Sequence, residues 1–203
     1  MQTISLLGCG KLGFPLALKL LNDGYHVKGS TTTTSKIEKF KQSGIIPYLI
    51  NIEDSIESDF FNSDILVLTL PYKKSFSDSN SYKTQIKKVC DSLIFSSIKH
   101  IIFTSSSSVY PKDNKLYLPT DKFIPPNKRA KILFDCEQVL CKMKNISVII
   151  IRLGGIYGAG RKINKSKQAR SLIKQSDAIR VIKESIKRVG DNDIINAFQR
   201  IIL

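Results

Sequence analysis

The chain has 203 residues, of which 42% are hydrophobic, enough for the core of one α/β domain. Its net charge of +15 favours anionic partners, but no recognised nucleic-acid motif accompanies the charge, so we expect no nucleic-acid binding. The four cysteines lack metal-ligand spacing, so we also expect no metal. Glycines and a proline interrupt the apolar stretch at 4–21, which argues against a membrane span or an export signal and favours a cytoplasmic protein.

Short apolar runs alternate with amphipathic segments along most of the chain. We predict strands at 3–7, 25–29, 46–50, 65–70, 100–104 and 146–152, and helices at 11–22, 35–42, 81–97 and 128–143. Ser35 is expected to cap the second of these helices, and Ile94 to lie on the inner side of the third. Strands that alternate with helices form a parallel sheet covered on both faces. The sequence therefore predicts a doubly wound, Rossmann-like α/β fold.

The C-terminal segment has the same alternation with shorter elements. We predict a strand at 168–173, a helix at 177–189 and a last strand at 194–198. The helix should turn four apolar side chains inward, namely Ile179, Ile182, Ile186 and Val189. Its opposite side carries Arg180, Lys183, Lys187 and Arg188. We interpret this basic stripe as solvated surface, with binding of a partner as the alternative.

A glycine-rich turn joins the first predicted strand to the first helix, with the sequence Gly8-Cys9-Gly10-Lys11-Leu12-Gly13. In such a turn the first glycine permits the tight bend, the second lets a pyrophosphate approach the backbone, and the third allows helix and strand to pack closely. The following helix N-terminus offers unpaired N–H groups to phosphate oxygens. We therefore predict a dinucleotide site with phosphate contacts from Gly8, Gly10, Lys11, Leu12 and Gly13. A purely structural turn is the alternative.

The end of the second strand indicates which dinucleotide is bound. A carboxylate there would accept hydrogen bonds from the adenosine ribose and repel a 2′-phosphate. Residues 28–36 instead read Lys-Gly-Ser-Thr-Thr-Thr-Thr-Ser-Lys, and hydroxyl groups with lysine suit a 2′-phosphate. We predict NADP(H) as the preferred cofactor, NAD(H) as the alternative, and contacts from Ser30, Thr31 and Lys36. An ordinary capping loop for the next helix would explain the same residues. Further cofactor contacts are expected from Leu70, Pro71, Thr104 and Lys131.

Four segments in a fixed order point to a family. They are the turn at 8–13, the run Ile-Phe-Thr-Ser-Ser-Ser-Ser-Val-Tyr at 102–110, Lys131 with its following helix, and Arg-Leu-Gly-Gly-Ile-Tyr-Gly-Ala-Gly-Arg at 152–161. Over residues 1 to about 161 the chain resembles the extended short-chain dehydrogenase/reductase superfamily and is similar to its nucleotide-sugar epimerases and dehydratases. The resemblance implies an NAD(P)-dependent epimerase, dehydratase or oxidoreductase reaction on a nucleotide-sugar-like substrate.

The same resemblance also implies a domain organisation. Members of the family continue into a substrate lobe, so we interpret residues 1–203 as a single dinucleotide-binding domain in which 162–203 are a reduced remnant of that lobe. A pocket built this way would be shallow, or would be completed by a second subunit of a homodimer.

In such enzymes a serine polarises the substrate oxygen, a tyrosine transfers the proton, and a lysine four residues later lowers the pKa of the tyrosine. The resemblance maps the serine to Ser106 and the lysine to Lys131, which leaves Asn127 at the tyrosine position. An amide has no ionisable proton near neutral pH and cannot act as general acid or base. We therefore expect cofactor binding with weak or altered catalysis. The alternatives are a substitute phenol, Tyr110 or Tyr157, and a catalytically silent dinucleotide-binding sensor or partner subunit.

Overall fold

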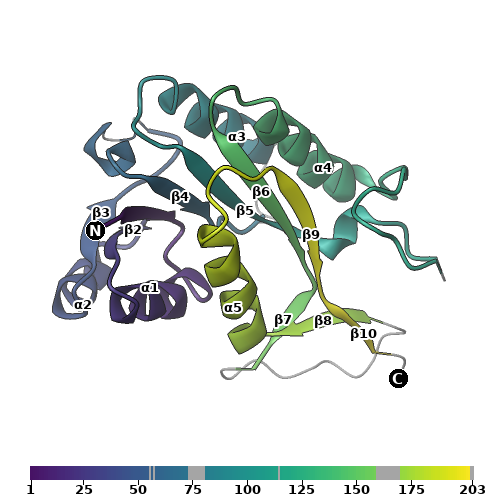
Figure 1. Ribbon diagram of the computed structural model, residues 1–203, viewed down its shortest axis with the longest axis horizontal. Coiled ribbons are helices and arrows are strands. Elements are labelled where there is room, and N and C mark those ends of the chain that lie inside the picture. The colour runs from purple at the N-terminus through teal and green to yellow at the C-terminus, as the bar shows by residue number, and fades with distance from the viewer. Residues whose placement is uncertain (55, 57, 73–80, 114, 159–169, 202–203) are drawn as a thin grey trace.

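Seven strands form one parallel sheet in the order β3-β2-β1-β4-β5-β6-β9 (Figure 1). The computed structural model describes residues 1–54, 56, 58–72, 81–113, 115–158 and 170–201. The strands are β1 (Thr3–Leu7), β2 (His26–Thr31), β3 (Ile46–Leu49), β4 (Ile65–Leu68), β5 (His100–Ser106), β6 (Ser147–Leu153) and β9 (Asp193–Ala197). Every neighbouring pair in this sheet is parallel. The predicted doubly wound α/β fold is confirmed.

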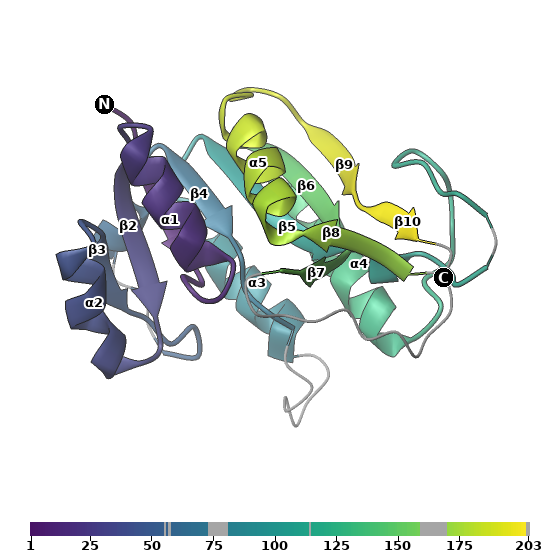
Figure 2. The same ribbon diagram turned by 90° about the horizontal axis from the view of Figure 1, so that it is seen from below.

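Helices cover both faces of this sheet (Figures 1 and 2). One face carries α1 (Gly13–Asn22), α2 (Ile37–Gln42) and α5 (Gln175–Ile186), and the other carries α3 (Ser81–Ser92) and α4 (Lys128–Cys141). Within the described residues, short 3-10 helices lie between these elements, namely η1 (Thr34–Lys36), η2 (Ser58–Phe61) and η3 (Ser107–Val109). A second sheet has the order β10-β8-β7 and consists of β7 (Gly155–Tyr157), β8 (Arg170–Lys174) and β10 (Gln199–Ile201).

The central strands are apolar throughout because both of their faces are buried. In β4, Leu66 and Leu68 pack into the core under α3 and α4, whereas Ile65 and Val67 pack into the core under α1 and α5. Successive side chains of a strand point to opposite faces, so a continuous apolar run fills two cores at once. β3 lies at the edge of the sheet, where Pro47 is tolerated.

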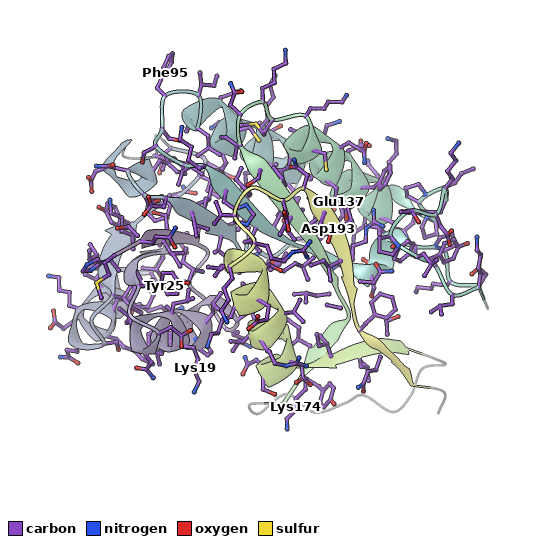
Figure 3. All side chains as sticks on the ribbon, in the orientation of Figure 1. Lys19, Tyr25, Phe95, Glu137, Lys174 and Asp193 are labelled. Atoms are coloured by element: carbon purple, nitrogen blue, oxygen red, sulfur yellow. The ribbon has the colours of Figure 1, made fainter. Side chains whose placement is uncertain are left out.

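Three local predictions are wrong at helix ends. The third predicted helix ends at Ser92, so Ile94 lies beyond it and is 66% exposed, next to Phe95, which projects into solvent (Figure 3). Val189 likewise follows the end of α5 and is 47% exposed. Ser35 lies within η1, and α2 begins two residues later without a capping side chain.

The C-terminal elements join the main layers of the domain. α5 packs beside α1, and β9 pairs with β6 as the last strand of the large sheet (Figure 2). β8 and β10 pair with each other, and β8 also pairs with β7. The interpretation of 162–203 as a reduced substrate lobe stays a prediction, and residues 162–169 lie outside the described part of the chain.

The basic stripe, which runs along α5 and the residues just after its end, is paired with carboxylates. The ion pairs are Arg180–Asp177 at 3.6 Å, Lys183–Asp23 at 2.7 Å, Lys187–Glu184 at 3.1 Å and Arg188–Asp191 at 2.9 Å. Neighbouring acids therefore balance much of the positive charge, and the interpretation of this stripe as solvated surface stays a prediction.

Candidate cofactor site

The glycine turn after β1 needs its glycines for different reasons. Gly8 has φ +100°, a conformation that favours glycine. A Cβ added at Gly13 would lie 2.6 Å from the Gly8 carbonyl oxygen, so the start of α1 packs against the turn too closely for a side chain. A Cβ at Gly10 would meet nothing nearer than 3.9 Å, which leaves open space over its backbone. That space is where a pyrophosphate could approach.

Hydrogen bonds to residues at the ends of two strands hold this turn. The Gly8 N–H donates to the hydroxyl oxygen of Ser30 in β2 at 2.9 Å, and the Cys9 N–H donates to the Ser30 carbonyl at 2.9 Å. From the end of β4, the Thr69 hydroxyl donates to the Gly8 carbonyl at 2.7 Å. Ser30, predicted as a cofactor contact, therefore also supports the turn. Thr69 was not predicted, although it directly precedes the predicted contacts Leu70 and Pro71.

A cavity of about 370 Å³ opens beside the turn, within the size range of small-molecule sites. It is lined by seven of the predicted cofactor residues, Gly8, Gly10, Ser30, Thr31, Lys36, Leu70 and Pro71. Its lining further includes Leu7, Cys9, Thr32, Thr33, Ile50, Asn51, Ile52, Glu53 and Gln85. The fold thus brings the ends of β1, β2, β3 and β4 and one residue of α3 around a single space.

The remaining predicted contacts are not in this lining. Gly13 lies beneath the turn, where it packs against Gly8. The Thr104 hydroxyl donates to the Leu68 carbonyl at 3.0 Å and so bridges β5 to β4. Lys11 and Leu12 form the last part of the turn before α1, and the Lys11 carbonyl is bonded from α5.

Among the described residues, two charged side chains line the cavity, Lys36 and Glu53. Burial raises the pKa of the Cys9 thiol to about 12, and the nearby Lys36 ammonium acts against that rise. Lys28, from the same basic and hydroxyl-rich run as Lys36, points elsewhere. Its ammonium donates to backbone carbonyls at Asp59 and Asn62, the latter at 3.0 Å. The sequence did not predict Glu53 as a lining residue, because the approach of Glu53 to the cavity depends on the path of the chain after β3.

The residues mapped to catalysis are each engaged in local contacts. Asn127 is the N-cap of α4, and its side-chain oxygen accepts a hydrogen bond from the Ala130 N–H at 3.0 Å. The Lys131 ammonium lies 3.0 Å from Asp135, with its side chain 67% exposed. The Ser106 hydroxyl accepts from the backbone N–H two residues later, at the start of η3, at 3.2 Å. The lining of the cavity contains neither Ser106, Asn127 nor Lys131.

Tyr110 belongs to a buried polar network. Its hydroxyl donates to the Asn196 side-chain oxygen at 2.8 Å and accepts from Arg152 at 2.6 Å. Arg152 also pairs with Glu137 at 2.7 Å, and the Ser105 hydroxyl donates to the same carboxylate. Tyr157 is half-buried in β7. A role for either phenol as substitute proton donor stays a prediction.

Sequence reasoning did not identify this network. The signal was available in Glu137, which interrupts the inner side of α4 between Leu133 and Leu140, where a lone carboxylate needs a buried partner. The network ties β5, β6, α4 and β9 together beneath the serine run.

The described ranges contain no group of three or more His, Cys, Asp or Glu side chains placed to hold a metal ion. Cys9, Cys90, Cys136 and Cys141 are all free thiols. Among the helices described, none has the length and apolar character needed to cross a bilayer.

The parallel sheet, the glycine turn and its cavity define a dinucleotide-binding Rossmann domain. Residues 3–116 match the family model of the NAD binding domain of 6-phosphogluconate dehydrogenase, and this chain belongs to that family.

The chain is also similar to one curated protein in sequence and to solved structures in fold. Protein YeeZ from Escherichia coli K12 is 34% identical over 167 residues, which cover 79% of this chain and 61% of the length of YeeZ. UDP-N-acetylglucosamine 4-epimerase from Bacillus cereus superposes with a TM-score of 0.82 at 15% identity, over 100% of this chain and 80% of that one. MoeE5 in complex with UDP-glucose and NAD also gives a TM-score of 0.82 at 15% identity, over 100% and 78%. At such identities the two structures establish a shared fold.

Proposed function

We propose that this NAD-binding domain prefers NADP(H) and binds a nucleotide-sugar-like ligand with weak or no turnover. The observation that carries the proposal is one cavity that joins the glycine turn to residues 31–33 and Lys36. Open space over Gly10 suits the pyrophosphate, and the threonine hydroxyls with the Lys36 ammonium suit a 2′-phosphate on the adenosine ribose. The nicotinamide ring would supply hydride transfer when the cofactor is bound.

Glu53 supports the competing preference for NAD(H). A carboxylate accepts hydrogen bonds from the two ribose hydroxyls and repels a phosphate. Whichever of Lys36 and Glu53 lies nearer to the ribose will decide the preference, and their effects are opposite in sign. Replacing each of them in turn therefore separates the two cofactors.

The test is a fluorescence titration of NADPH and NADH against wild type and charge variants. We expect tighter binding of NADPH, and Lys36→Glu should remove that preference, whereas Glu53→Gln should increase it. Lys41→Glu is the matched control, because it makes the same charge change at an exposed position on α2 outside the cavity lining. Equal effects of Lys36→Glu and Lys41→Glu would contradict a local contact with the 2′-phosphate.

The nucleotide-sugar ligand is supported by two observations. MoeE5, which shares the fold, was solved with UDP-glucose and NAD. The segments at 102–110 and 152–161 resemble those of the epimerases and dehydratases. Screening UDP-sugars with NADP⁺ and NAD⁺ by proton NMR should detect binding with slow or absent conversion. Rapid conversion would show that another group supplies the proton.

A catalytically silent sensor or partner subunit is the second candidate. It is favoured by the local bonding of Asn127 and Lys131, which gives each side chain a role in α4 without catalysis. Cofactor binding with no detectable conversion of any nucleotide sugar is the outcome that selects it.

A further inference from the structure

One carbonyl in the glycine turn lacks its ordinary helical donor. In an α-helix each carbonyl accepts from the N–H four residues later. At the start of α1, Phe14 donates to Gly10 at 2.9 Å and Leu16 donates to Leu12 at 3.2 Å. The carbonyl between them, that of Lys11, would need the N–H of residue 15. That residue is Pro15, which has no N–H to donate.

A side chain from the far end of the chain provides the missing donor. The Gln175 amide nitrogen donates to the Lys11 carbonyl at 2.8 Å across 164 positions of sequence. Gln175 is the first residue of α5, immediately after Lys174, which Figure 3 labels. α1 and α5 lie side by side on the same face of the sheet (Figure 2), and a second contact joins them where Lys183 pairs with Asp23 at the end of α1.

The hydrogen bond from Gln175 orients the whole peptide group between Lys11 and Leu12. The Lys11 carbonyl and the Leu12 N–H belong to one planar peptide group and point in opposite directions. Holding the oxygen therefore sets the direction of the N–H. Leu12 is one of the predicted phosphate contacts, and its N–H lies at the N-terminus of α1, where orphan donors face a bound anion.

We propose that Gln175 is a positioning residue for the dinucleotide pyrophosphate, and that it acts by orienting the peptide between Lys11 and Leu12. The inference rests on the proposed phosphate role of the glycine turn. It makes docking of α5 part of the cofactor site, although α5 lies outside the cavity lining and beyond the segment matched by the NAD-binding family model. Loss of the Gln175 amide should therefore weaken cofactor binding without removing any group that touches the cofactor.

The experiment compares NADPH affinity, by fluorescence, in wild type, Gln175→Ala and Gln175→Glu. Gln175→Ala should bind about three- to tenfold more weakly, the range expected for one hydrogen bond. Gln175→Glu keeps the size of the side chain but places a carboxylate against the Lys11 carbonyl, so its loss should be larger. Ser176→Ala changes the exposed neighbouring residue of α5 and should bind as wild type does.

A rescue separates positioning from general damage. Pro15→Ala restores an N–H at residue 15, which can then donate to Lys11 within α1. In this background Gln175→Ala should lose little further affinity. Unchanged affinity of Gln175→Ala in the wild-type background, or an equal loss in both backgrounds, would overturn the inference alone. If wild type binds neither NADPH nor NADH, the proposed function fails and the phosphate role of Leu12 fails with it.

Discussion

The Arg152 guanidinium and the Glu137 carboxylate form an ion pair inside the domain, 2.7 Å apart, with both side chains no more than 1% exposed. Ser105 and Tyr110 supply further hydrogen bonds to this pair. Such a pair holds two charges in a region of low dielectric constant. Removing one partner therefore leaves the other charge buried and unpaired.

Glu137→Ala should therefore destabilise the protein by about 3–5 kcal/mol in urea unfolding. Asp135→Ala is the matched control on the same helix. It breaks partly exposed pairs with Lys83 and Lys131, and should cost no more than about 1 kcal/mol. Similar losses for the two variants would contradict the buried role assigned to Glu137.

The glycine turn predicts different stabilities for two similar substitutions. Gly13→Ala forces a Cβ against the Gly8 carbonyl and should lower stability by about 1–3 kcal/mol, with loss of cofactor binding. Gly10→Ala has room within the protein and should keep wild-type stability. It should still weaken the binding of NADPH, because the added methyl group would lie where the pyrophosphate is expected to approach. Thermal unfolding and NADPH titration of both variants make the comparison. Unchanged NADPH affinity in Gly10→Ala would contradict the predicted approach of the pyrophosphate to Gly10.

Asn127 should behave as a helix cap. Asn127→Ala removes the acceptor for the Ala130 N–H and should cost about 1 kcal/mol, whereas Asn127→Ser keeps a capping oxygen and should cost less. Neither variant should change the slow or absent turnover of nucleotide sugars. Chemical unfolding and the NMR assay measure the two effects, and a change in turnover on Asn127→Ser, in either direction, would assign the amide a role in the reaction.

His100 makes the stability of the fold depend on pH. Its ring is fully buried, with one nitrogen 2.6 Å from the Ser147 hydroxyl and the other donating to the Ser185 carbonyl. Burial lowers the pKa of His100 below its ordinary 6.5, although the Ser185 and Ser147 hydrogen bonds and the charge of Asp191 oppose the shift, and Arg188 adds to it. The unfolded chain then binds a proton before the folded chain does. Stability should therefore fall as pH drops below about 6.5 towards the lower folded pKa.

The test is urea unfolding between pH 7.5 and pH 5 in wild type and two variants. His100→Gln should flatten the loss of stability over this range, while His26→Gln, at the exposed histidine, should leave it in place. An identical pH dependence in all three proteins would assign the acid sensitivity to other groups.

Elements that depend on local sequence could be predicted. The apolar run at 65–70 marks a doubly buried strand, and the spacing of three glycines after a strand marks the turn at 8–13. Helix ends were less accurate, because Leu93, Ile94 and Phe95 continue an apolar pattern past Ser92 without a glycine or proline to stop it. The three-residue strands β7 and β10 are too short to leave a pattern.

The parts of the site that escaped prediction depend on contacts between distant segments. Glu53 approaches the cavity through the loop after β3, and Gln175 reaches Lys11 only because α5 packs beside α1. Composition and spacing within one segment carry no information about such contacts. The role of Asn127 as the N-cap of α4 could have been predicted from the sequence, because asparagine is a preferred residue at that position.

The most direct test of the account is a calorimetric titration of the wild-type chain with NADPH and with NADH. We expect saturable binding of both reduced cofactors at a single site, with NADPH the tighter, and loss of both in Gly13→Ala. The absence of heat with either cofactor, in protein whose fold is confirmed by circular dichroism, would contradict the dinucleotide site at the glycine turn.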